Sequence, residues 1–189
     1  MQVYLIRHGA TAGNLQKRYI GSTDEPLTQE AKRNLAEKAF PLPEILVVSP
    51  LRRCRETAEI LFPGHPFFVE PALRETDFGE FEGKNYRDLS KDPRYQAWID
   101  SGGTIAFPKG ESPMQARARW TDGFLRYCRE YEPQAKSIGF VVHGGTIMGI
   151  LDAFSQPHED FYHWQVDNGS GYRACWDGFE KLTKIKKIG

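Results

Sequence analysis

The hydrophobic pattern of this chain alternates between short apolar runs and longer segments whose apolar residues recur at helical spacing. Runs this short and this apolar are typical of buried parallel strands. Four of them predict strands, at residues 2–7, 45–48, 67–70 and 137–142. Tyr172, Ala174 and Trp176 alternate as in a fifth strand. The turn signal Asp177-Gly178 and the Lys-rich run 180–188 favour a sixth strand at an edge of the sheet.

Capping residues and helical periodicity predict helices between these strands. Thr28 is a suitable N-cap for one helix, and Ser49-Pro50 and Ser112-Pro113 are suitable starts for two others. Helical segments are expected at residues 11–16, 85–101, 113–131 and 146–154. Alternating strands and helices predict an α/β fold. We expect a single three-layer domain over 1–189, with a mainly parallel central sheet, helices on both faces, an antiparallel edge and a small helical cap at about 80–110.

The composition is that of an ordinary globular domain without a charge bias. The 189 residues include 25 Lys and Arg against 25 Asp and Glu, so the net charge favours neither a nucleic-acid nor a membrane partner. No apolar run reaches the roughly 20 residues of a membrane helix, and no signal peptide is evident. Cys54, Cys128 and Cys175 are widely spaced, which predicts a reduced cytoplasmic protein without a disulfide framework. The oligomeric state stays open, with a homodimer as one option.

Two of the apolar runs end in a histidine that is followed by glycine. The first run ends in Arg7-His8-Gly9, and the run at 137–142 ends in His143-Gly144-Gly145. In open α/β sheets, ligands bind just outside the carboxyl ends of the strands. We therefore expect His8 and His143 to lie side by side at the mouth of a pocket.

A third run, at residues 45–48, leads into a helix that begins with several arginines. Arg52, Arg53 and Arg55 cannot all point inward at helical spacing. Arg52 is nearest to the strand end and is expected in the pocket, with Arg55 within reach one turn later, whereas Arg53 is expected to be a solvated charge. With Arg7 and the two histidines, Arg52 would form a cationic cup that suits a phosphate dianion.

Phosphoryl transfer in such a cup needs an acceptor, positive charge around the phosphoryl oxygens and a proton for the leaving oxygen. A neutral histidine can be the nucleophile, and arginine binds phosphate oxygens bidentately, so neither a metal nor a cofactor is required. Glu75, in a loop rich in carboxylates, is the preferred proton donor if burial raises its pKa. Asp77 and Glu80 remain alternatives on this argument.

Other chemically suggestive residues have more ordinary interpretations. His158 and His163 do not have metalloprotease spacing, and a solvated loop or cap is the better interpretation. Arg117 and Arg119 on the long predicted helix are expected to be surface charges. Among the four tryptophans, only Trp164 is expected to line a ligand cavity.

Four sequence blocks together resemble the histidine phosphatase superfamily, whose fold is phosphoglycerate-mutase-like. The blocks are Leu5-Ile6-Arg7-His8-Gly9 with Asn14, Ser49-Pro50-Leu51-Arg52-Arg53 with Thr57-Ala58, Leu73-Arg74-Glu75 with Gly79, and Val142-His143-Gly144-Gly145. The resemblance covers nearly the whole chain. It implies that His8 becomes phosphorylated, that Arg7, Arg52 and His143 complete the phosphate pocket, and that Glu75 donates the proton. It also implies that Asn14 and Gly144 contact the phosphate and that Ile20 and Gly21 border the substrate.

The branch of the superfamily is less sharply indicated. Mutases carry basic residues after the glutamate, whereas Thr76-Asp77-Phe78-Gly79 follows Glu75 here, which favours hydrolysis of a small phosphate monoester. Blocks at 78–83, 110–112 and 163–169 resemble the α-ribazole phosphatase group of cobalamin synthesis. A phosphoglycerate-type mutase, a broad-specificity or sugar phosphatase, and a non-catalytic domain that binds phosphorylated ligands remain alternatives.

Overall fold

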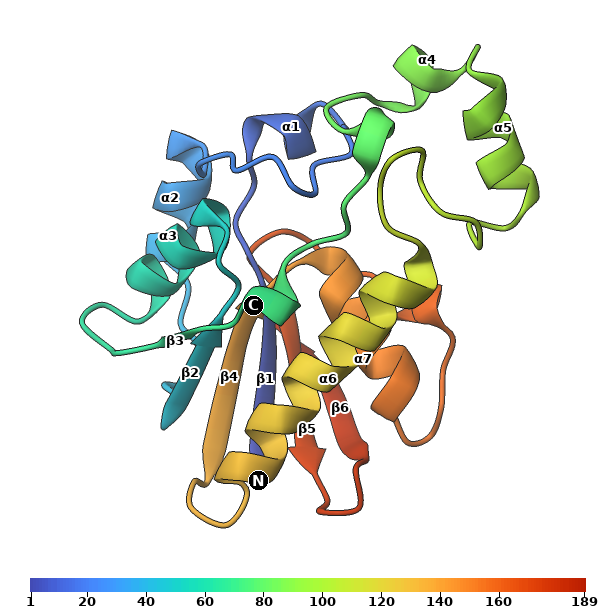
Figure 1. Cartoon of the computed structure of the whole chain (residues 1–189). Helices are drawn as coiled ribbons and strands as arrows, with labels where there is room; N and C mark the ends of the chain where they lie inside the picture. The colour runs from blue at the N-terminus through green and yellow to red at the C-terminus, as the bar shows by residue number, and fades with distance from the viewer.

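The computed structural model describes residues 1–189 as one six-stranded sheet with helices on both faces (Figure 1). The strands are β1 (Gln2–Arg7), β2 (Ile45–Val48), β3 (Phe68–Val69), β4 (Ser137–Val142), β5 (Gly171–Trp176) and β6 (Leu182–Ile188). Their order across the sheet is β3-β2-β4-β1-β5-β6. The first four strands are parallel, and β5 and β6 form an antiparallel edge. The predicted α/β fold with a mainly parallel sheet is confirmed.

Seven α-helices and three 3₁₀ turns connect these strands. They are α1 (Ala12–Leu15), α2 (Gln29–Ala36), α3 (Arg52–Leu61), α4 (Tyr86–Leu89), α5 (Pro93–Asp100), α6 (Pro113–Tyr131) and α7 (Gly144–Phe154), with turns η1 (Pro71–Leu73), η2 (Gly79–Phe81) and η3 (Phe161–Trp164). As predicted, Thr28 and Ser112 cap α2 and α6 by accepting backbone N–H bonds. By contrast, α3 begins at Arg52 with Leu51 as its N-cap, later than Ser49-Pro50 predicts.

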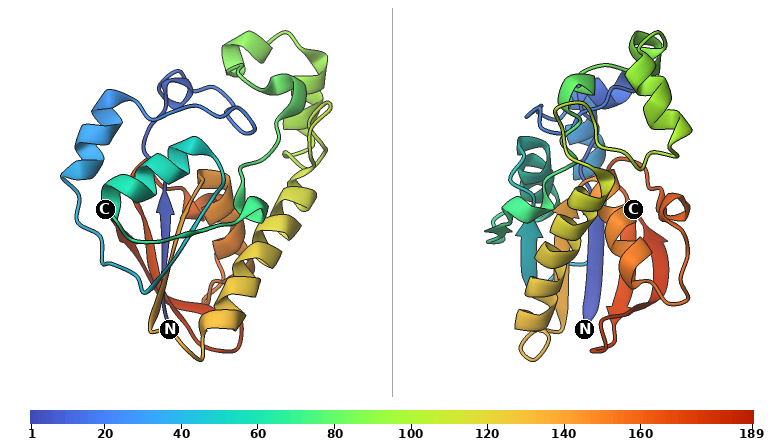
Figure 2. Two further views of the ribbon diagram at one scale, coloured as in Figure 1. Left: turned by 60° about the vertical axis from the view of Figure 1, so that its left-hand side comes forward. Right: turned by 45° about the vertical axis from the view of Figure 1, so that its right-hand side comes forward.

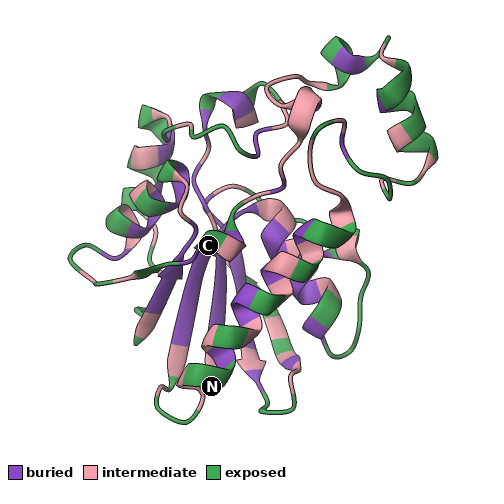
Figure 3. Ribbon diagram, in the orientation of Figure 1, coloured by how far each residue is buried: buried purple, intermediate pink, exposed green.

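Alternating residues of the central strands divide the core into two parts. Val3 and Leu5 face one side, in a cluster to which α6 and α7 contribute, whereas Tyr4 and Ile6 face the other side with Cys54 of α3. This period of two is the one expected for a sheet covered on both faces. The helices form outer layers in Figure 2, and the central strands are buried almost throughout in Figure 3.

Strand register brings three distant segments to one point. Arg7 at the end of β1 is paired with Val142 at the end of β4, and Val48 at the end of β2 is paired with Val141. The residues that follow these strands, His8, Ser49 and His143, therefore leave the sheet side by side. This is the carboxyl edge of the parallel strands, where α/β folds bind ligands.

Helices α4 and α5 lie above this edge, away from the sheet (Figure 1). Their own small core contains Phe81, Leu89, Tyr95 and Phe107. The aromatic ring of Tyr19, from the loop after α1, packs against this cluster. No helix in the structure has both the length and the apolar character needed to cross a membrane.

Candidate active site

His8 and His143 meet at the carboxyl edge of the sheet, with ring centroids 5.1 Å apart. His8 is buried, and its Nδ1 lies 2.6 Å from the carbonyl oxygen of Gly9. Because a carbonyl oxygen can only accept, Nδ1 carries the proton and Nε2 keeps a free lone pair. Burial, reinforced by Arg53 and Arg7, holds the pKa of His8 well below its ordinary value. The ring is therefore neutral and is a candidate nucleophile.

The second histidine is held between a serine and an arginine. His143 Nδ1 accepts the Nε–H of Arg53 at 3.3 Å, and His143 Nε2 lies 2.6 Å from Ser49 Oγ. Since an arginine can only donate, the proton of His143 sits on Nε2. Burial and the nearby Arg53 keep the pKa of His143 well below its ordinary value. Beside it, burial raises the pKa of the Cys54 thiol to about 12, which leaves no thiolate nucleophile here.

The arginine of α3 that enters the pocket is Arg53, and the prediction for Arg52 is wrong. Arg53 is fully buried, and besides His143 it donates to the carbonyl oxygens of Thr23, Ile20 and Gly21. The Arg52 side chain is 53% exposed and forms an ion pair with Glu56 at 2.8 Å.

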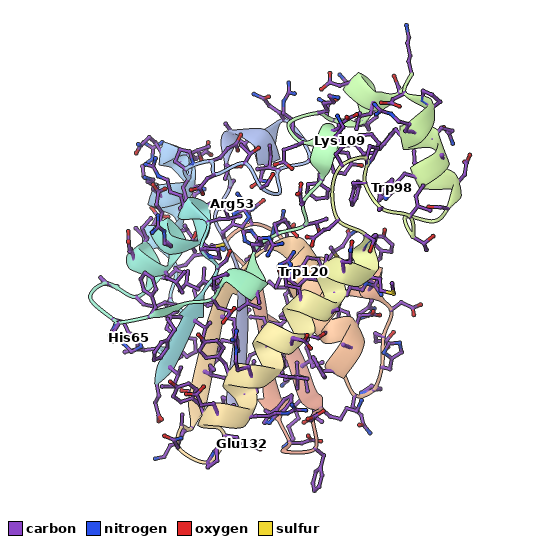
Figure 4. All side chains as sticks on the ribbon, viewed as in Figure 1. Arg53, His65, Trp98, Lys109, Trp120 and Glu132 are labelled. Carbon is purple, nitrogen blue, oxygen red and sulfur yellow. The ribbon has the colours of Figure 1, made fainter.

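Helical spacing explains this difference between neighbouring arginines. Arg53 shares its face of α3 with Thr57, four residues later, and both are buried together with Cys54 and Ala58. Arg52 is turned away and faces Glu56, and Arg55 is exposed. Figure 4 labels Arg53 at the end of α3 that faces the carboxyl edge of the sheet. The i, i+4 spacing of Arg53 and Thr57 could have identified Arg53 as the buried arginine. Choosing the arginine nearest to the end of β2 gave the wrong residue.

Arg7 lies beside the histidines with part of its guanidinium free. One of its terminal nitrogens donates to the carbonyl oxygen of Val166 at 2.6 Å, and its buried Nε has no partner. Burial lowers the pKa of Arg7, although nearby Glu75 and Asp167 oppose this effect. A Cβ at Gly144 would lie 3.3 Å from the guanidinium carbon, so glycine permits this close approach.

Asn14 lies in the pocket beside Arg7, and its hydrogen bonds define the orientation of its amide group. Its Oδ1 accepts the backbone N–H of Thr11 at 3.1 Å and the Nδ2 of Asn168 at 3.2 Å. Both contacts use the oxygen, so the Asn14 Nδ2 remains a donor. Asn168 also donates to the carbonyl oxygen of His8 at 3.1 Å, and it thereby connects Asn14 to the nucleophile segment. Sequence reasoning assigned Asn168 no role, because a single amide in a loop carries no periodic signal.

Glu75 is the loop carboxylate that the fold brings to the pocket. Its two oxygens accept the backbone N–H of Thr76 at 2.9 Å and of Gly145 at 3.2 Å. Burial raises the pKa of Glu75 despite these contacts and the nearby arginines. By contrast, Asp77 accepts the N–H of Gly79 in its own turn, and Glu80 forms surface ion pairs with Arg94 and Lys109.

Two residues of α6 fix the loop that carries Glu75. Arg119 donates to the carbonyl oxygens of Ala72 and Arg74, at 2.7 and 2.8 Å. Trp120 Nε1 also donates to the Arg74 carbonyl, at 2.7 Å. The prediction that Arg119 is a surface charge is wrong, because its side chain is only 13% exposed and satisfies these loop carbonyls. Arg117 is 42% exposed and pairs with Asp152.

Ile20 and Gly21 lie at the border of this pocket through their backbone. Their carbonyl oxygens accept hydrogen bonds from a terminal nitrogen of the Arg53 guanidinium, at 3.3 Å for Ile20 and 3.0 Å for Gly21. A Cβ at Gly21 would lie 1.7 Å from the carbonyl oxygen of Thr76, so any larger residue would force this loop away from the Glu75 segment.

Comparison with known proteins places this geometry in a family. The family model described as histidine phosphatase superfamily (branch 1) matches residues 3–185. The chain belongs to this superfamily. It is an enzyme family with phosphatase and mutase members, as the relatives below illustrate, and the resemblance seen in the sequence is confirmed.

Similar histidine phosphatases include both types of enzyme. The adenosylcobalamin/alpha-ribazole phosphatase of Escherichia coli (strain K12) is 28% identical, over all of this chain and 94% of the relative. A protein of Cronobacter sakazakii named probable phosphoglycerate mutase GpmB is 32% identical, over 80% of this chain and 73% of the relative. Among solved structures, the alpha-ribazole phosphatase of Shigella flexneri has the same fold, with a TM-score of 0.87 at 24% identity, covering 100% of this chain and 96% of that one. Phosphoglycerate mutase of Thermus thermophilus has a TM-score of 0.75 at 29% identity, covering 100% and 99%.

A cavity of about 690 Å³ opens beside Glu75 in this member of the histidine phosphatase superfamily. Aromatic side chains form much of its lining, namely Tyr19, Phe78, Trp98, Phe107, Trp120, Phe161 and Tyr162. The buried Nε1 of Trp98 has no hydrogen-bond partner. Trp164 does not line this cavity, contrary to prediction, because it is buried in the core on the α7 side and donates to the Glu159 carbonyl instead. We name this space, defined by its contact with Glu75, the leaving-group cavity.

His158 and His163 do not line the pocket. The side chains of His158 and His163 are 63% and 55% exposed, and their nearest carboxylates are 4.0 and 3.8 Å away. The His, Cys, Asp and Glu residues of the chain form no group of three that would hold a metal ion.

Proposed function

We propose that this protein is a phosphomonoesterase that works through phosphorylation of His8. The observation that carries the proposal is the fixed tautomer of His8, which leaves a neutral Nε2 lone pair beside two arginines. Neutral imidazole is a nucleophile near pH 7 without a separate base. In the first step, Nε2 attacks phosphorus, the bond from phosphorus to the ester oxygen breaks, and the phosphoryl group remains on His8.

The phosphoryl oxygens would be bound by Arg7, Arg53 and Asn14 Nδ2, together with the backbone N–H of Gly144 at the start of α7. Arg53 replaces Arg52 in this role because only Arg53 reaches the pocket. His143 orients Arg53 through Nδ1, and its Nε2–H, which donates to Ser49 Oγ at 2.6 Å, would be shared with a phosphoryl oxygen. Two arginines already supply positive charge to the transferring group, so we propose that no metal ion is required.

Glu75 would serve first as acid and then as base. Its raised pKa favours the protonated form, which can give its proton to the leaving oxygen. The resulting carboxylate then takes a proton from water, the water oxygen attacks phosphorus, and the bond to His8 Nε2 breaks. Free phosphate is released, and Glu75 is again protonated.

The leaving-group cavity favours an uncharged, aromatic leaving group. Its charged lining residues are Glu75 and the pair Arg117–Asp152, in which the two charges compensate at 2.9 Å. A carboxylated substrate such as phosphoglycerate would find no free cation there. We therefore propose hydrolysis rather than mutase chemistry, with α-ribazole 5'-phosphate of cobalamin synthesis as the candidate substrate. The name of the Escherichia coli relative supports the same choice.

We propose that residues 1–189 act as one histidine phosphatase domain whose cap, at about 80–110, covers the substrate. Three unpaired thiols, two of them buried, support a reducing cytoplasmic setting. The expected partner is a small phosphate monoester.

The test is phosphate release in the presence of EDTA from p-nitrophenyl phosphate, α-ribazole 5'-phosphate and 3-phosphoglycerate. His8→Ala is expected to lower release by about 10⁴-fold or more, whereas the exposed His158→Ala is expected to match wild type. Acid-labile phosphohistidine should be trapped in wild type alone.

Three results would contradict the proposal. Isomerisation of 3-phosphoglycerate that requires 2,3-bisphosphoglycerate, without free phosphate, would assign a mutase. Phosphate release abolished by EDTA would exclude the metal-free mechanism. Tight phosphate binding by wild type without turnover of any substrate would indicate a binding domain.

A further inference from the structure

A second cavity lies across Tyr19 from the leaving-group cavity, and Tyr19 lines both. This second cavity has a volume of about 320 Å³. Its lining consists of basic, amide and tyrosine side chains, namely Arg7, Asn14, Lys17, Arg18, Tyr19, Tyr86 and Asn168. No carboxylate is among them. We name it the basic cavity.

The positive charge of the basic cavity is only partly compensated. The cavity has three cations, Arg7, Lys17 and Arg18. Arg18 has the most hydrogen-bond partners, because it donates to Gln16, the Gly83 carbonyl and Asp88. Lys17 forms no ion pair and no side-chain hydrogen bond, and the buried Nε of Arg7 has no partner. The site therefore offers free donors and net positive charge to an anion.

Lys17 is attached rigidly to the segment that carries Asn14. The N–H of Lys17 donates to the Asn14 carbonyl at 3.0 Å, and the N–H of Arg18 donates to the Gly13 carbonyl at 2.9 Å. The backbone of Lys17 is left-handed, with φ of 54°, a conformation that side-chain-bearing residues other than asparagine and aspartate seldom adopt. The turn thus places a lysine directly beside a proposed phosphate ligand.

The basic cavity lies on a different side of the reacting phosphorus from the leaving group. Glu75 and Gly145 line the leaving-group cavity, whereas Arg7 and Asn14 line the basic cavity. In an in-line displacement, the ester oxygen and later the attacking water both lie opposite His8 Nε2. They would occupy the Glu75 side, so the basic cavity faces the phosphoryl oxygens instead.

We propose that the basic cavity is a second phosphate subsite, in which Lys17 and the free part of Arg7 bind a phosphate dianion next to the phosphohistidine pocket. The proposal rests on the proposed phosphatase function. The dianion is product phosphate that leaves sideways after hydrolysis, because a second phosphate carried by the substrate would belong to the leaving group on the Glu75 side. Inhibition kinetics tests this assignment.

The direct test is calorimetric titration of inorganic phosphate into wild type, Lys17→Asn and Lys91→Ala. Asparagine removes the charge and tolerates the left-handed backbone, and Lys91 is an exposed lysine outside both cavities. Wild type and Lys91→Ala should bind two phosphates. Lys17→Asn should keep the tighter site and weaken the other by about 2- to 5-fold, the range expected for an exposed charge.

One binding site in wild type, or two sites unchanged in Lys17→Asn, would overturn the proposal. Binding is measured without turnover, so a failure of phosphatase activity would be seen separately. A kinetic measurement then tests whether the dianion is the product. Lys17→Asn should weaken the inhibition of p-nitrophenyl phosphate hydrolysis by inorganic phosphate, and inhibition unchanged from wild type would overturn the proposal.

Discussion

The phosphate pocket and the leaving-group cavity are neighbours, yet they are built in different ways. Residues that directly follow β1, β2 and β4 form the pocket, and backbone or buried polar groups hold His8, His143 and Arg53. The leaving-group cavity is formed largely by aromatic side chains from loops and from α5 and α6. Packing holds these rings, as where Trp98 stacks on Tyr95 with centroids 6.1 Å apart.

This difference predicts that the phosphate pocket controls the rate of phosphoryl transfer and that the leaving-group cavity controls the choice of substrate. Hydrogen bonds fix orientation and protonation state, so a change in the pocket should alter turnover of every substrate. Aromatic packing fixes shape and apolar area, so a change in the cavity should alter only substrates whose leaving group fills it. Variants on either side of the boundary can test this division.

Glu75 lies at the boundary, and its replacement should have the largest effect among the following variants. Glu75→Gln should lower kcat/KM for an alkyl phosphate by about 10³-fold, because the leaving alkoxide needs a proton. For p-nitrophenyl phosphate, whose leaving group needs no proton, the loss of kcat/KM should be far smaller, although kcat should fall for both esters because the variant lacks the base for hydrolysis of phospho-His8. Glu80→Gln, which changes a surface carboxylate with ion pairs to Arg94 and Lys109, is the control. Equal losses of kcat/KM for both esters would contradict proton donation by Glu75.

The pH dependence of kcat/KM should also reveal proton donation by Glu75. The first step needs neutral His8 and protonated Glu75. Burial lowers the pKa of His8 below 6.5, so the acid limb of kcat/KM should lie below pH 6.5. Burial raises the pKa of Glu75 above 4.5, so activity on alkyl phosphates should fall as pH rises through that higher value. Glu75→Gln should abolish the alkaline limb and leave the acid limb, and a profile unchanged in the variant would contradict this assignment.

Neighbouring arginines of α3 provide a matched pair inside and outside the pocket. Arg53→Lys should lower kcat/KM by about 10²-fold for every substrate, because lysine cannot reproduce the planar guanidinium contacts. Arg52→Lys should stay within about twofold of wild type, as expected for an exposed ion pair. Steady-state kinetics with two unrelated esters measures both. A larger loss in Arg52→Lys than in Arg53→Lys would mean that Arg52, and not Arg53, binds the phosphoryl group.

The same two arginines show what the sequence predicts and what it leaves out. Strand runs are fixed by local apolarity, so β1, β2 and β4 were predicted at their observed bounds. Their histidines were predicted together because parallel strands share a carboxyl edge. Side-chain direction at the first turn of α3 depended on where the helix begins, and that point was predicted too early.

Two other residues, Asn168 in a loop and Arg119 on α6, were beyond prediction for a different reason. They act by bonding to backbone atoms far away in sequence, such as the His8 and Ala72 carbonyls. These contacts depend on tertiary structure alone and leave no periodic trace in the chain. The sequence predicts a helical cap at about 80–110, but the cavity that its aromatic side chains line, Trp98 and Phe107 among them, required the structure.

Trp98 tests the cavity side of the comparison. Trp98→Ala should raise KM for an aromatic phosphate about 10-fold, because the ring supplies apolar area in the leaving-group cavity. Trp98→Phe should raise it about threefold, since it keeps a ring but removes the buried Nε1 donor that lacks a partner. Methyl phosphate, too small to reach the cap, should be hydrolysed as by wild type. An equal loss for methyl phosphate would mean that the cap also shapes the phosphate pocket.

Ser49 tests the pocket side with the smallest expected effect on turnover. Ser49→Ala removes the oxygen acceptor of His143 Nε2–H and leaves this buried donor only the weak acceptor Cys54 Sγ, at 3.5 Å. The variant should lose about 1–3 kcal/mol of unfolding free energy, and kcat should fall less than about 10-fold because Arg53 still holds Nδ1. Saturating phosphate should recover part of this stability, since a phosphoryl oxygen can accept the same proton. Denaturant unfolding with and without phosphate measures both effects, with the exposed Ser22→Ala as control. Equal losses with and without phosphate would mean that His143 serves only as a support for Arg53 and does not contact the phosphoryl group.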